Sequence, residues 1–297
     1  MRGRRTLPDI LPTMAGTLKI AIVGPGRLGH ALALELKRAG YSITEILSRS
    51  APASRGKARR LAGKIGARVS TSRDAELDAN VVWLCVPDRT ITAAARGLAA
   101  ATDWKGKIAF HSSGALTSDE LDVLRKRGAA VASVHPLMTF VSDSAPSLTG
   151  VPIAIEGDAA ALSMARRIVR GLRGDAFLLP RERKAAYHAW GAFASPLLLA
   201  LLVTAEQVAQ AAGIPPTDAR RKMLPIVRQT IANYAILGPA GALSGPIVRG
   251  DAEIVKRHLQ AIKETPEASD VYVALARAAL RYLPAGGRAE IRKMLGK

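Results

Sequence analysis

The chain has 297 residues, of which 48% are hydrophobic, and its 43 Lys and Arg against 24 Asp and Glu give a formal charge of +19. This composition excludes a disordered chain, which would be poor in aliphatic residues, and the single cysteine, Cys85, excludes an internal disulfide framework. We therefore expect two globular domains of roughly 100–200 residues each, in a reducing, cytoplasmic setting.

Residues 1–16 are predicted to form a polar tail. This segment contains two prolines and the pair Arg4-Arg5, but no apolar stretch of about 7–15 residues follows, as a secretory signal would require. We therefore expect no export signal, and Met14 is an alternative start to Met1.

The first chemical signal is a glycine-rich turn between a strand and a helix. Residues 18–23 are typical of a buried parallel strand, and the apolar spacing from Leu28 to Leu36 predicts a helix that stops at Gly40. Between them lies the GxGxxG pattern: Gly24, Pro25, Gly26, Arg27, Leu28 and Gly29. In this context it predicts dinucleotide binding, because the glycines allow a tight turn, close approach to a diphosphate and helix packing on the strand. An ordinary glycine turn in an α/β protein is the alternative.

The end of the second predicted strand, residues 43–47, indicates which dinucleotide is bound. An NAD site places Asp or Glu there to bind the ribose 2′-hydroxyl. This chain instead has Ser48, Arg49 and Ser50, with Arg55 and Lys57 just beyond. A cation with two hydroxyls suits a 2′-phosphate, so we expect NADP (NADPH) as the cofactor; the alternative is that Arg49 is an ordinary surface charge.

Three further apolar runs, residues 81–86, 107–110 and 129–134, predict more strands of the same sheet. Ligands of open parallel sheets bind at the carboxyl ends of the strands. The residues expected to contact the cofactor there are Val86, Pro87, Asp88 and Ser112. Those expected to contact the substrate are Ser113 and Gly114.

Two local signals complete the first half of the chain. Thr117 and Glu120 have the spacing of a capping box, which predicts a helix start. A strand over residues 151–155 and a helix over residues 159–172 follow. The predicted fold class is therefore α/β, with a Rossmann doubly wound parallel sheet over residues 17–178.

From about residue 181 the sequence changes to long Ala- and Leu-rich helices, so residues 179–297 are predicted to form an all-helical second domain. Within it, residues 185–205 are uncharged and about as long as a membrane span. A lipid-facing helix is the alternative, but His188 and Pro196 favour a buried helix of the domain or of a dimer interface. We expect no membrane partner.

A polar stripe on the first of these helices is the predicted catalytic face. Helical spacing relates five residues within an otherwise apolar segment: Lys184, Tyr187, His188, Gly191 and Ser195. Lys184 or His188 is expected to polarise or protonate the C=O or C=N being reduced, and His135, at the end of a strand, is a third candidate. The alternative is a solvated lysine at the helix start and a hydrogen-bonded histidine in the core.

A later apolar helix carries Gln229 and Asn233 at helical spacing, and the glycine-proline loop after it carries Arg249. Asn233 and Arg249 are candidate substrate-binding residues, Arg249 through bidentate contact with a carboxylate; a structural ion pair is the alternative for Arg249. The five histidines are scattered, and the sequence has no HExxH, CxxC or carboxylate-rich loop, so no metal is expected.

The basic excess gathers in two segments. Residues 49–73 carry eight Lys or Arg and no acid, and residues 166–184 carry seven against two acids. Neither stretch interleaves its basic residues with aromatics as single-strand binders do, and the sequence has no zinc-finger, RNA-recognition or basic-zipper motif. Nucleic acid is therefore not an expected partner. Part of the charge adjoins the predicted 2′-phosphate site, and solvated helix faces are the simplest reading of the rest.

Several motifs match one bacterial family in order along the chain: residues 22–29, 85–88, 111–116, 134–137, 154–158, 184–188 and 243–251. The chain resembles proteins with a Rossmann-like domain followed by the domain of unknown function 2520. These are similar to pyrroline-5-carboxylate reductase, ketopantoate reductase and the 6-phosphogluconate and β-hydroxyacid dehydrogenases. The resemblance runs from about residue 18 to residue 280. It implies an NADP-binding domain and a helical domain for substrate binding and dimerisation, hence a homodimer formed through the helical domain.

The chain departs from these relatives on the predicted catalytic helix. In the β-hydroxyacid dehydrogenases a helix carries Lys and, four residues on, Asn, whereas here Lys184 is followed by His188 at that spacing. Many proteins with the domain of unknown function 2520 have Asn where this chain has Pro196, which removes a hydrogen-bonding side chain.

Together these signals predict an NADP(H)-dependent oxidoreductase that reduces or oxidises a small, anionic oxo/imino or hydroxy/amino compound. The alternative is a non-catalytic NADP-binding regulatory protein that kept the nucleotide site and lost the chemistry.

Overall fold

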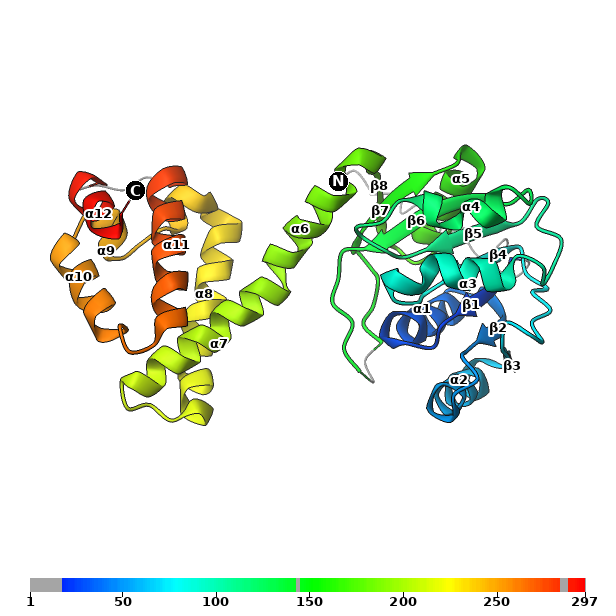
Figure 1. The fold of residues 1–297 in the computed structure, drawn as a ribbon, viewed down its shortest axis with the longest axis horizontal. Coiled ribbons are helices and arrows are strands. Elements are labelled where there is room, and N and C mark those ends of the chain that lie inside the picture. Colours follow the sequence, from blue (N-terminus) through cyan, green and yellow to red (C-terminus); the bar gives the residue numbers. More distant parts are fainter. Residues whose placement is uncertain (1–17, 143–144, 284–287, 297) are drawn as a thin grey trace, which may run out of the picture. The chain divides into compact units, whose positions relative to one another are not determined.

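The computed structural model describes residues 18–142, 145–283 and 288–296 (Figure 1). The predicted tail, residues 1–16, and with it the choice between Met1 and Met14, lies outside the described residues. The chain divides into two compact units within helix α6 (Lys184–Ala194), the first ending at Gly191 and the second beginning at Ala192. The predicted boundary at residue 178 falls at the end of the last strand of the first unit.

The first unit is built on an eight-stranded sheet in the order β3-β2-β1-β4-β5-β6-β7-β8. Its strands are β1 (Lys19–Val23), β2 (Ser42–Leu47), β3 (Arg68–Ser70), β4 (Val81–Leu84), β5 (Ile108–His111), β6 (Ala130–Pro136), β7 (Pro152–Gly157) and β8 (Asp175–Leu178). All neighbours are parallel except β6 and β7, which are antiparallel. The order of β1 to β6 is that of a doubly wound dinucleotide-binding sheet, as predicted.

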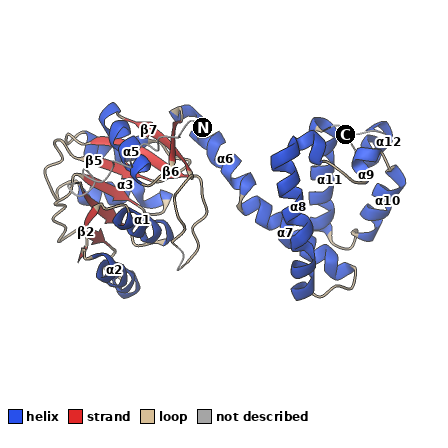
Figure 2. Ribbon diagram, turned by 180° about the vertical axis from the view of Figure 1, so that it is seen from behind, coloured by secondary structure: helices blue, strands red, loops and turns tan. Residues whose placement is uncertain are grey.

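Helices cover both faces of this sheet (Figure 2). They are α1 (Arg27–Arg38), α2 (Pro52–Ile65), α3 (Ile91–Leu98), α4 (Asp122–Arg125) and α5 (Ala159–Gly171), with short 3₁₀ turns at Asp88–Thr90, Ser118–Leu121 and Arg181–Arg183. Helices α1, α2 and α5 pack on one face, in a core that contains Ile22 and Leu36. Helices α3 and α4 pack on the other face with Val82 and Leu84. Two buried faces explain why the strands are continuous apolar runs.

The predicted capping box at Thr117 is wrong. The Thr117 side chain makes no capping bond to the helix backbone but donates to Asp119, and Glu120 accepts a hydrogen bond from the Thr92 hydroxyl instead of reaching back. The segment is a 3₁₀ turn followed by the short α4 rather than one longer helix. A tertiary partner on α3 has therefore overridden the local signal.

The second unit is all-helical in the residues that the structure describes, as predicted. Its helices are the end of α6, then α7 (Pro196–Ala211), α8 (Pro216–Ala242), α9 (Pro246–Arg249), α10 (Ala252–Ala261), α11 (Pro266–Tyr282) and α12 (Arg288–Leu295). A small core joins α10, α11 and α12 through Val255, Leu280 and Ile291.

Two helical segments, Arg181–Ala211 and Pro216–Arg249, are long and apolar enough to cross a membrane by length and composition alone. In the most apolar stretch of each, no residue is buried in this chain, although several are half-buried. The large exposed side chains include Trp190, Phe193, Leu199, Ile226 and Ile236, of which Ile236 is 80% exposed. Residues 185–205 were predicted to form a helix buried either in the helical domain or in a dimer interface. The structure contradicts burial within the domain, whereas the dimer interface remains a prediction.

Candidate functional site

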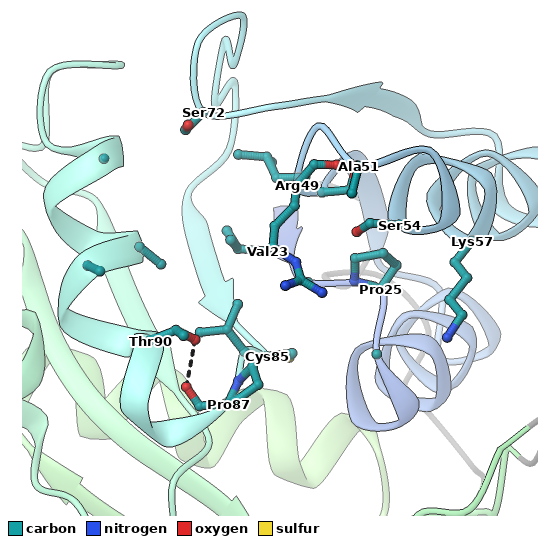
Figure 3. A pocket seen from close by; sticks show the side chains of 18 of the residues that line it. Val23, Pro25, Arg49, Ala51, Ser54, Lys57, Ser72, Cys85, Pro87 and Thr90 are labelled. Atoms are coloured by element: carbon teal, nitrogen blue, oxygen red, sulfur yellow. Dashed lines mark hydrogen bonds between the residues drawn. The ribbon is translucent and has the colours of Figure 1, made fainter.

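A pocket of about 580 Å³ opens at the carboxyl ends of β1, β2 and β4, where the strand order reverses (Figure 3). Open α/β sheets bind their ligands at this position. Its lining comes from the glycine-rich turn, from the start of α2 and from the segment that leads into α3: Val23, Gly24, Pro25, Gly26, Leu47, Ser48, Arg49, Ala51, Ala53, Ser54, Lys57, Ser72, Cys85, Val86, Pro87, Arg89, Thr90, Ala93, Ala94, Gly97 and Leu98.

The three glycines of the turn differ in what surrounds them. Gly24 has φ +101°, and a Cβ there would lie 2.6 Å from the Cys85 carbonyl oxygen; a Cβ on Gly29 would lie 2.0 Å from the Gly24 carbonyl oxygen. A Cβ on Gly26 would meet only the Cys85 oxygen, at 3.9 Å. The first and third glycines are thus required by the protein's own packing, whereas the second leaves free space on the pocket side. A diphosphate fits that space, against the N-terminus of α1, whose first turn holds no acidic residue.

Among the described residues, three cationic side chains and no acidic one line the pocket. They are Arg49 just after β2, Lys57 on α2 and Arg89 in the 3₁₀ turn before α3. Figure 3 shows the Arg49 side chain extending toward Pro25, with Ser54 between Arg49 and Lys57. Within the described part of the chain, none of the three makes a side-chain hydrogen bond or ion pair, so their charges are available to an anionic ligand.

The structure divides the predicted cofactor residues into two groups. Those that line the pocket are Gly24, Pro25, Gly26, Ser48, Arg49, Val86 and Pro87. Those that do not line it are Arg27, Leu28, Gly29, Ser50, Asp88 and Ser112. Sequence reasoning missed Ser54, Ser72, Arg89, Thr90 and the α3 residues. Arg89 could have been identified from the sequence, because it directly follows Pro87 and Asp88 after the end of a predicted strand.

Asp88 and Ser112 belong instead to a polar network beside the pocket. The Trp83 indole N–H donates to Ser112 Oγ at 2.8 Å, and Ser113 Oγ donates to Asp88 Oδ2 at 2.7 Å. Ser113 Oγ also accepts the Leu116 backbone N–H at 2.9 Å. Ser113 is therefore a buried anchor of the turn after β5, and its side chain is not free for a substrate.

His111, at the end of β5, is held as a neutral imidazole. Its Nδ1 accepts the Ser113 backbone N–H at 3.1 Å, so its Nε2 carries the proton and donates to the Thr117 carbonyl oxygen, 2.9 Å away. Burial lowers the pKa of His111 to about 4, and the nearby Lys184 charge acts in the same direction.

Lys184, a predicted catalytic residue, is 1% exposed. Its Nζ donates to the Ser113 carbonyl oxygen at 3.0 Å and to Ser133 Oγ at 2.7 Å. Burial lowers the pKa of Lys184 to about 8, opposed by the carboxylates of Glu156 and Asp88.

The other two catalytic candidates, His135 and His188, lie together with ring centroids 6.1 Å apart. His135 Nδ1 is 2.9 Å from the Tyr187 hydroxyl oxygen. A Cβ on Gly114 would lie 2.7 Å from His188 Cδ2 and 2.9 Å from His135 Nε2, so the Gly114 backbone touches both rings. Burial lowers the pKa of His135 to about 4, with Lys184 and His188 next in effect, whereas His188 is exposed. We call Gly114, His135, Tyr187 and His188 the histidine site.

The remaining predicted residues lie in the second unit. Asn233 accepts a hydrogen bond from Gln229 at 2.7 Å on an exposed face of α8, and Arg249 pairs with Asp251 at 2.8 Å. Arg249 therefore has the structural ion pair that was the alternative reading. Ser195 has left the helical conformation where Pro196 begins α7, so the polar stripe on α6 ends at Gly191. The described residues contain no group of three or more potential metal ligands.

Each half of the chain matches the model of a known domain family. Residues 5–136 match the Rossmann-like domain, and residues 151–279 match the domain of unknown function 2520. The chain carries a Rossmann-like domain followed by a domain of unknown function 2520. The resemblance inferred from the motifs is confirmed. His135 falls in the first match, whereas Tyr187 and His188 fall in the second, so the histidine site draws on both matched segments while lying within the first structural unit.

Solved structures share this two-domain fold. A candidate NADP oxidoreductase of Bacteroides fragilis is 20% identical and superposes with a TM-score of 0.75 over 89% of this chain and 98% of its own. A protein of Thermotoga maritima is 24% identical, with a TM-score of 0.69 over 92% and 100% of the two chains. A reductive aminase of Aspergillus terreus, solved with NADPH and ethyl-5-oxohexanoate, is 18% identical, with a TM-score of 0.65 over 91% and 96%. A search of curated proteins found no match.

Proposed function

We propose that this chain is an NADP(H)-dependent oxidoreductase acting on a small, anionic oxo/imino or hydroxy/amino compound. The observation that carries the proposal is the pocket at the sheet's switch point, which combines an open Gly26, a helix N-terminus and three unpaired cations. Fold relatives of this chain include a protein described as an NADP oxidoreductase and a reductive aminase solved with NADPH, which supports the same nucleotide.

The charge distribution favours NADP over NAD. Arg49, Lys57 and the Ser54 hydroxyl lie on the side of the pocket formed by the end of β2 and the start of α2, where the ribose of a dinucleotide binds. The described residues place no carboxylate in the pocket lining there to bind a free 2′-hydroxyl. Arg89 comes from a different element, the 3₁₀ turn between β4 and α3, so we assign it to the part that NAD and NADP share.

The test is a set of alanine substitutions read by titrating tryptophan fluorescence with NADPH and with NADH. Arg49→Ala and Lys57→Ala should each weaken NADPH binding by roughly 10- to 100-fold, because a charge-assisted hydrogen bond contributes about 1.5–3 kcal/mol, and should leave NADH binding within about threefold. Arg89→Ala should weaken both nucleotides alike. Arg60→Ala removes a charge from α2 outside the pocket and is the matched control. Equal affinities of the unsubstituted protein for NADPH and NADH would refute the choice of NADP.

The proposed chemistry uses the histidine site. The nicotinamide of a bound cofactor supplies or accepts the hydride. His188 is the exposed imidazole, and we assign it as the proton donor to the reduced oxygen or nitrogen. His135 is neutral at pH 7 because of its lowered pKa, so its role is to donate a hydrogen bond and to orient Tyr187 and the substrate.

The alternative is a nucleotide-binding regulatory protein without chemistry. A screen of oxo-acids and cyclic imines, followed by the loss of NADPH absorbance, separates the two. Turnover that is lost in His188→Ala but not in His258→Ala, a histidine of the second unit, would support the enzyme. Tight NADPH binding with no turnover on any compound would favour the regulatory protein.

We further propose a homodimer formed through the helical unit. The exposed apolar side chains along α6, α7 and α8 support it, because a monomeric soluble protein rarely leaves so many large apolar groups in water.

A further inference from the structure

We infer that Lys184 is a positioning residue: its buried ammonium fixes the Ser112–Gly114 turn against His135 and His188 and does not itself give a proton to the substrate. This inference rests on the proposed function, because it divides the roles within the same site. It differs from the role expected for a lysine that follows the pattern of the β-hydroxyacid dehydrogenases.

The first argument is where the donors of Lys184 point. One bond goes to the Ser113 carbonyl oxygen in the turn and one goes to Ser133 Oγ on β6, and Ser133 Oγ also donates to that carbonyl, at 3.0 Å. The ammonium thus ties α6 to two neighbouring strand ends. Two of its three N–H donors are engaged in these bonds, and because the side chain is 1% exposed the third does not face open solvent.

The second argument is what the fixed turn carries. The Ser113 amide N–H is bound to His111, its hydroxyl is bound to Asp88, and its carbonyl oxygen is bound to Lys184. Every polar group of Ser113 is therefore hydrogen-bonded. The next residue, Gly114, is the one whose backbone touches the His135 and His188 rings. A shift of the turn therefore moves both imidazoles.

The third argument is electrostatic. The ionisable groups that interact with the ammonium are Asp88, Glu156, His111 and His135. Burial is the main cause of the lowered pKa of both histidines, and the positive charge of Lys184 lowers it further, so the ammonium favours the neutral form of His135. A side chain that served only to fill space would not have this effect.

The experiment uses ¹H–¹⁵N spectra of the full-length protein without substrate, with the tryptophan indole and histidine side-chain signals as reporters. Trp83 donates to Ser112 and so reports on the turn, whereas Trp104 donates to the Leu98 carbonyl and serves as an internal reference. The variants are Lys184→Met, Lys184→Arg and Ser133→Ala. Lys64→Met, on the exposed face of α2, is the matched loss of a lysine.

Lys184→Met should shift the Trp83 indole and His188 ring signals, leave Trp104 unmoved and raise the pKa of His135; Lys184→Arg should restore the low pKa of His135 because it keeps the charge. Ser133→Ala keeps the Lys184 bond to the Ser113 carbonyl and should therefore move the Trp83 and His188 signals less than Lys184→Met does. Lys184→Gln, whose shorter uncharged side chain cannot make both bonds, takes the place of Lys184→Met if that variant does not fold. Unmoved Trp83 and His188 signals in Lys184→Met, or in Lys184→Gln when only that variant folds, would overturn the inference.

An activity measurement separates positioning from proton transfer. With NADPH and a cyclic imine such as 2-methyl-1-pyrroline as probe, Lys184→Met should lower kcat but keep the shape of its pH profile, because His188 still donates. Loss of the basic limb of that profile in Lys184→Met alone would make Lys184 the donor and overturn the inference. If the unsubstituted protein turns over no probe, the proposed catalysis fails, while the spectra still decide whether Lys184 holds the turn.

Discussion

At the scale of single residues, the glycines of the turn have two different roles, packing within the protein and access for a ligand. Gly29 has no room for a side chain because the Gly24 carbonyl lies where its Cβ would be, whereas Gly26 has room that the protein itself does not use. The same residue type is therefore a packing requirement at one position and a ligand requirement three residues earlier.

These two glycines should separate stability from binding. Gly29→Ala should lower the free energy of unfolding by about 1–3 kcal/mol, the usual cost of overpacking, whereas Gly26→Ala should cost less than about 1 kcal/mol. Gly26→Ala should instead weaken NADPH binding by more than about tenfold, because its methyl group occupies the diphosphate position. Urea unfolding and fluorescence titration of both variants measure this. Full NADPH affinity in Gly26→Ala would show that the nucleotide does not approach this backbone.

At the scale of elements, the site depends on the ends of β5 and β6. His111 closes β5 as a buried neutral ring, and its bonds to Ser113 and Thr117 start and finish the turn on which Gly114 sits. Protonation of His111 would put a second donor against the Ser113 N–H, so the turn is stable only while this ring is neutral.

This arrangement predicts a pH dependence of stability. The pKa of His111 is about 4 in the folded chain and near 6.5 when exposed, so between these values the unfolded state binds the proton and the folded state does not. The contribution of His111 to stability should be constant above about pH 6.5 and fall below it, by about 3 kcal/mol at about pH 4. Urea unfolding of the protein and of His111→Gln, which keeps an amide N–H for Thr117, isolates the contribution. Parallel curves for the two proteins between about pH 7 and pH 4.5 would contradict it.

The elements also show what a sequence can predict and what it cannot. The glycine turn and Arg49 were found because the signal lies in consecutive residues around β1 and β2. The burial of Lys184 was not found, because its partners Ser113 and Ser133 lie 71 and 51 residues away. Strand β8 was missed because at the sheet edge its four residues are only partly buried and form no continuous apolar run.

At the scale of the whole molecule, two surface properties matter. The charge of +19 is concentrated in part on α2, whose exposed Arg59, Arg60 and Lys64 lie beyond the pocket cations. Such a field raises the local concentration of anions and speeds their association. The helices α6 to α8 differ from α2 in exposing many large apolar side chains, such as Phe193, Leu199 and Ile236.

The apolar surface predicts the oligomeric state. Size-exclusion chromatography with light scattering should give twice the chain mass of 31.3 kDa, and Phe193→Asp combined with Ile236→Asp should give the monomer, because charges are strongly disfavoured in a buried apolar interface. Leu178→Asp, another exposed apolar position in the first unit, is the control. A monomer that floats with lipid vesicles would point to a membrane surface instead of a second copy.

The only cysteine in the sequence, Cys85, is buried where it lines the pocket, and burial raises the pKa of its thiol. Cys85 should therefore react only slowly with thiol reagents. A spin label or fluorophore attached to a cysteine introduced at the surface will then report from that position alone. Pairs of such labels, one in each unit, would measure the distance between the units in solution and its change when nucleotide is added. The rate at which Cys85 itself reacts with a thiol reagent would measure how often the pocket lining around it opens to solvent.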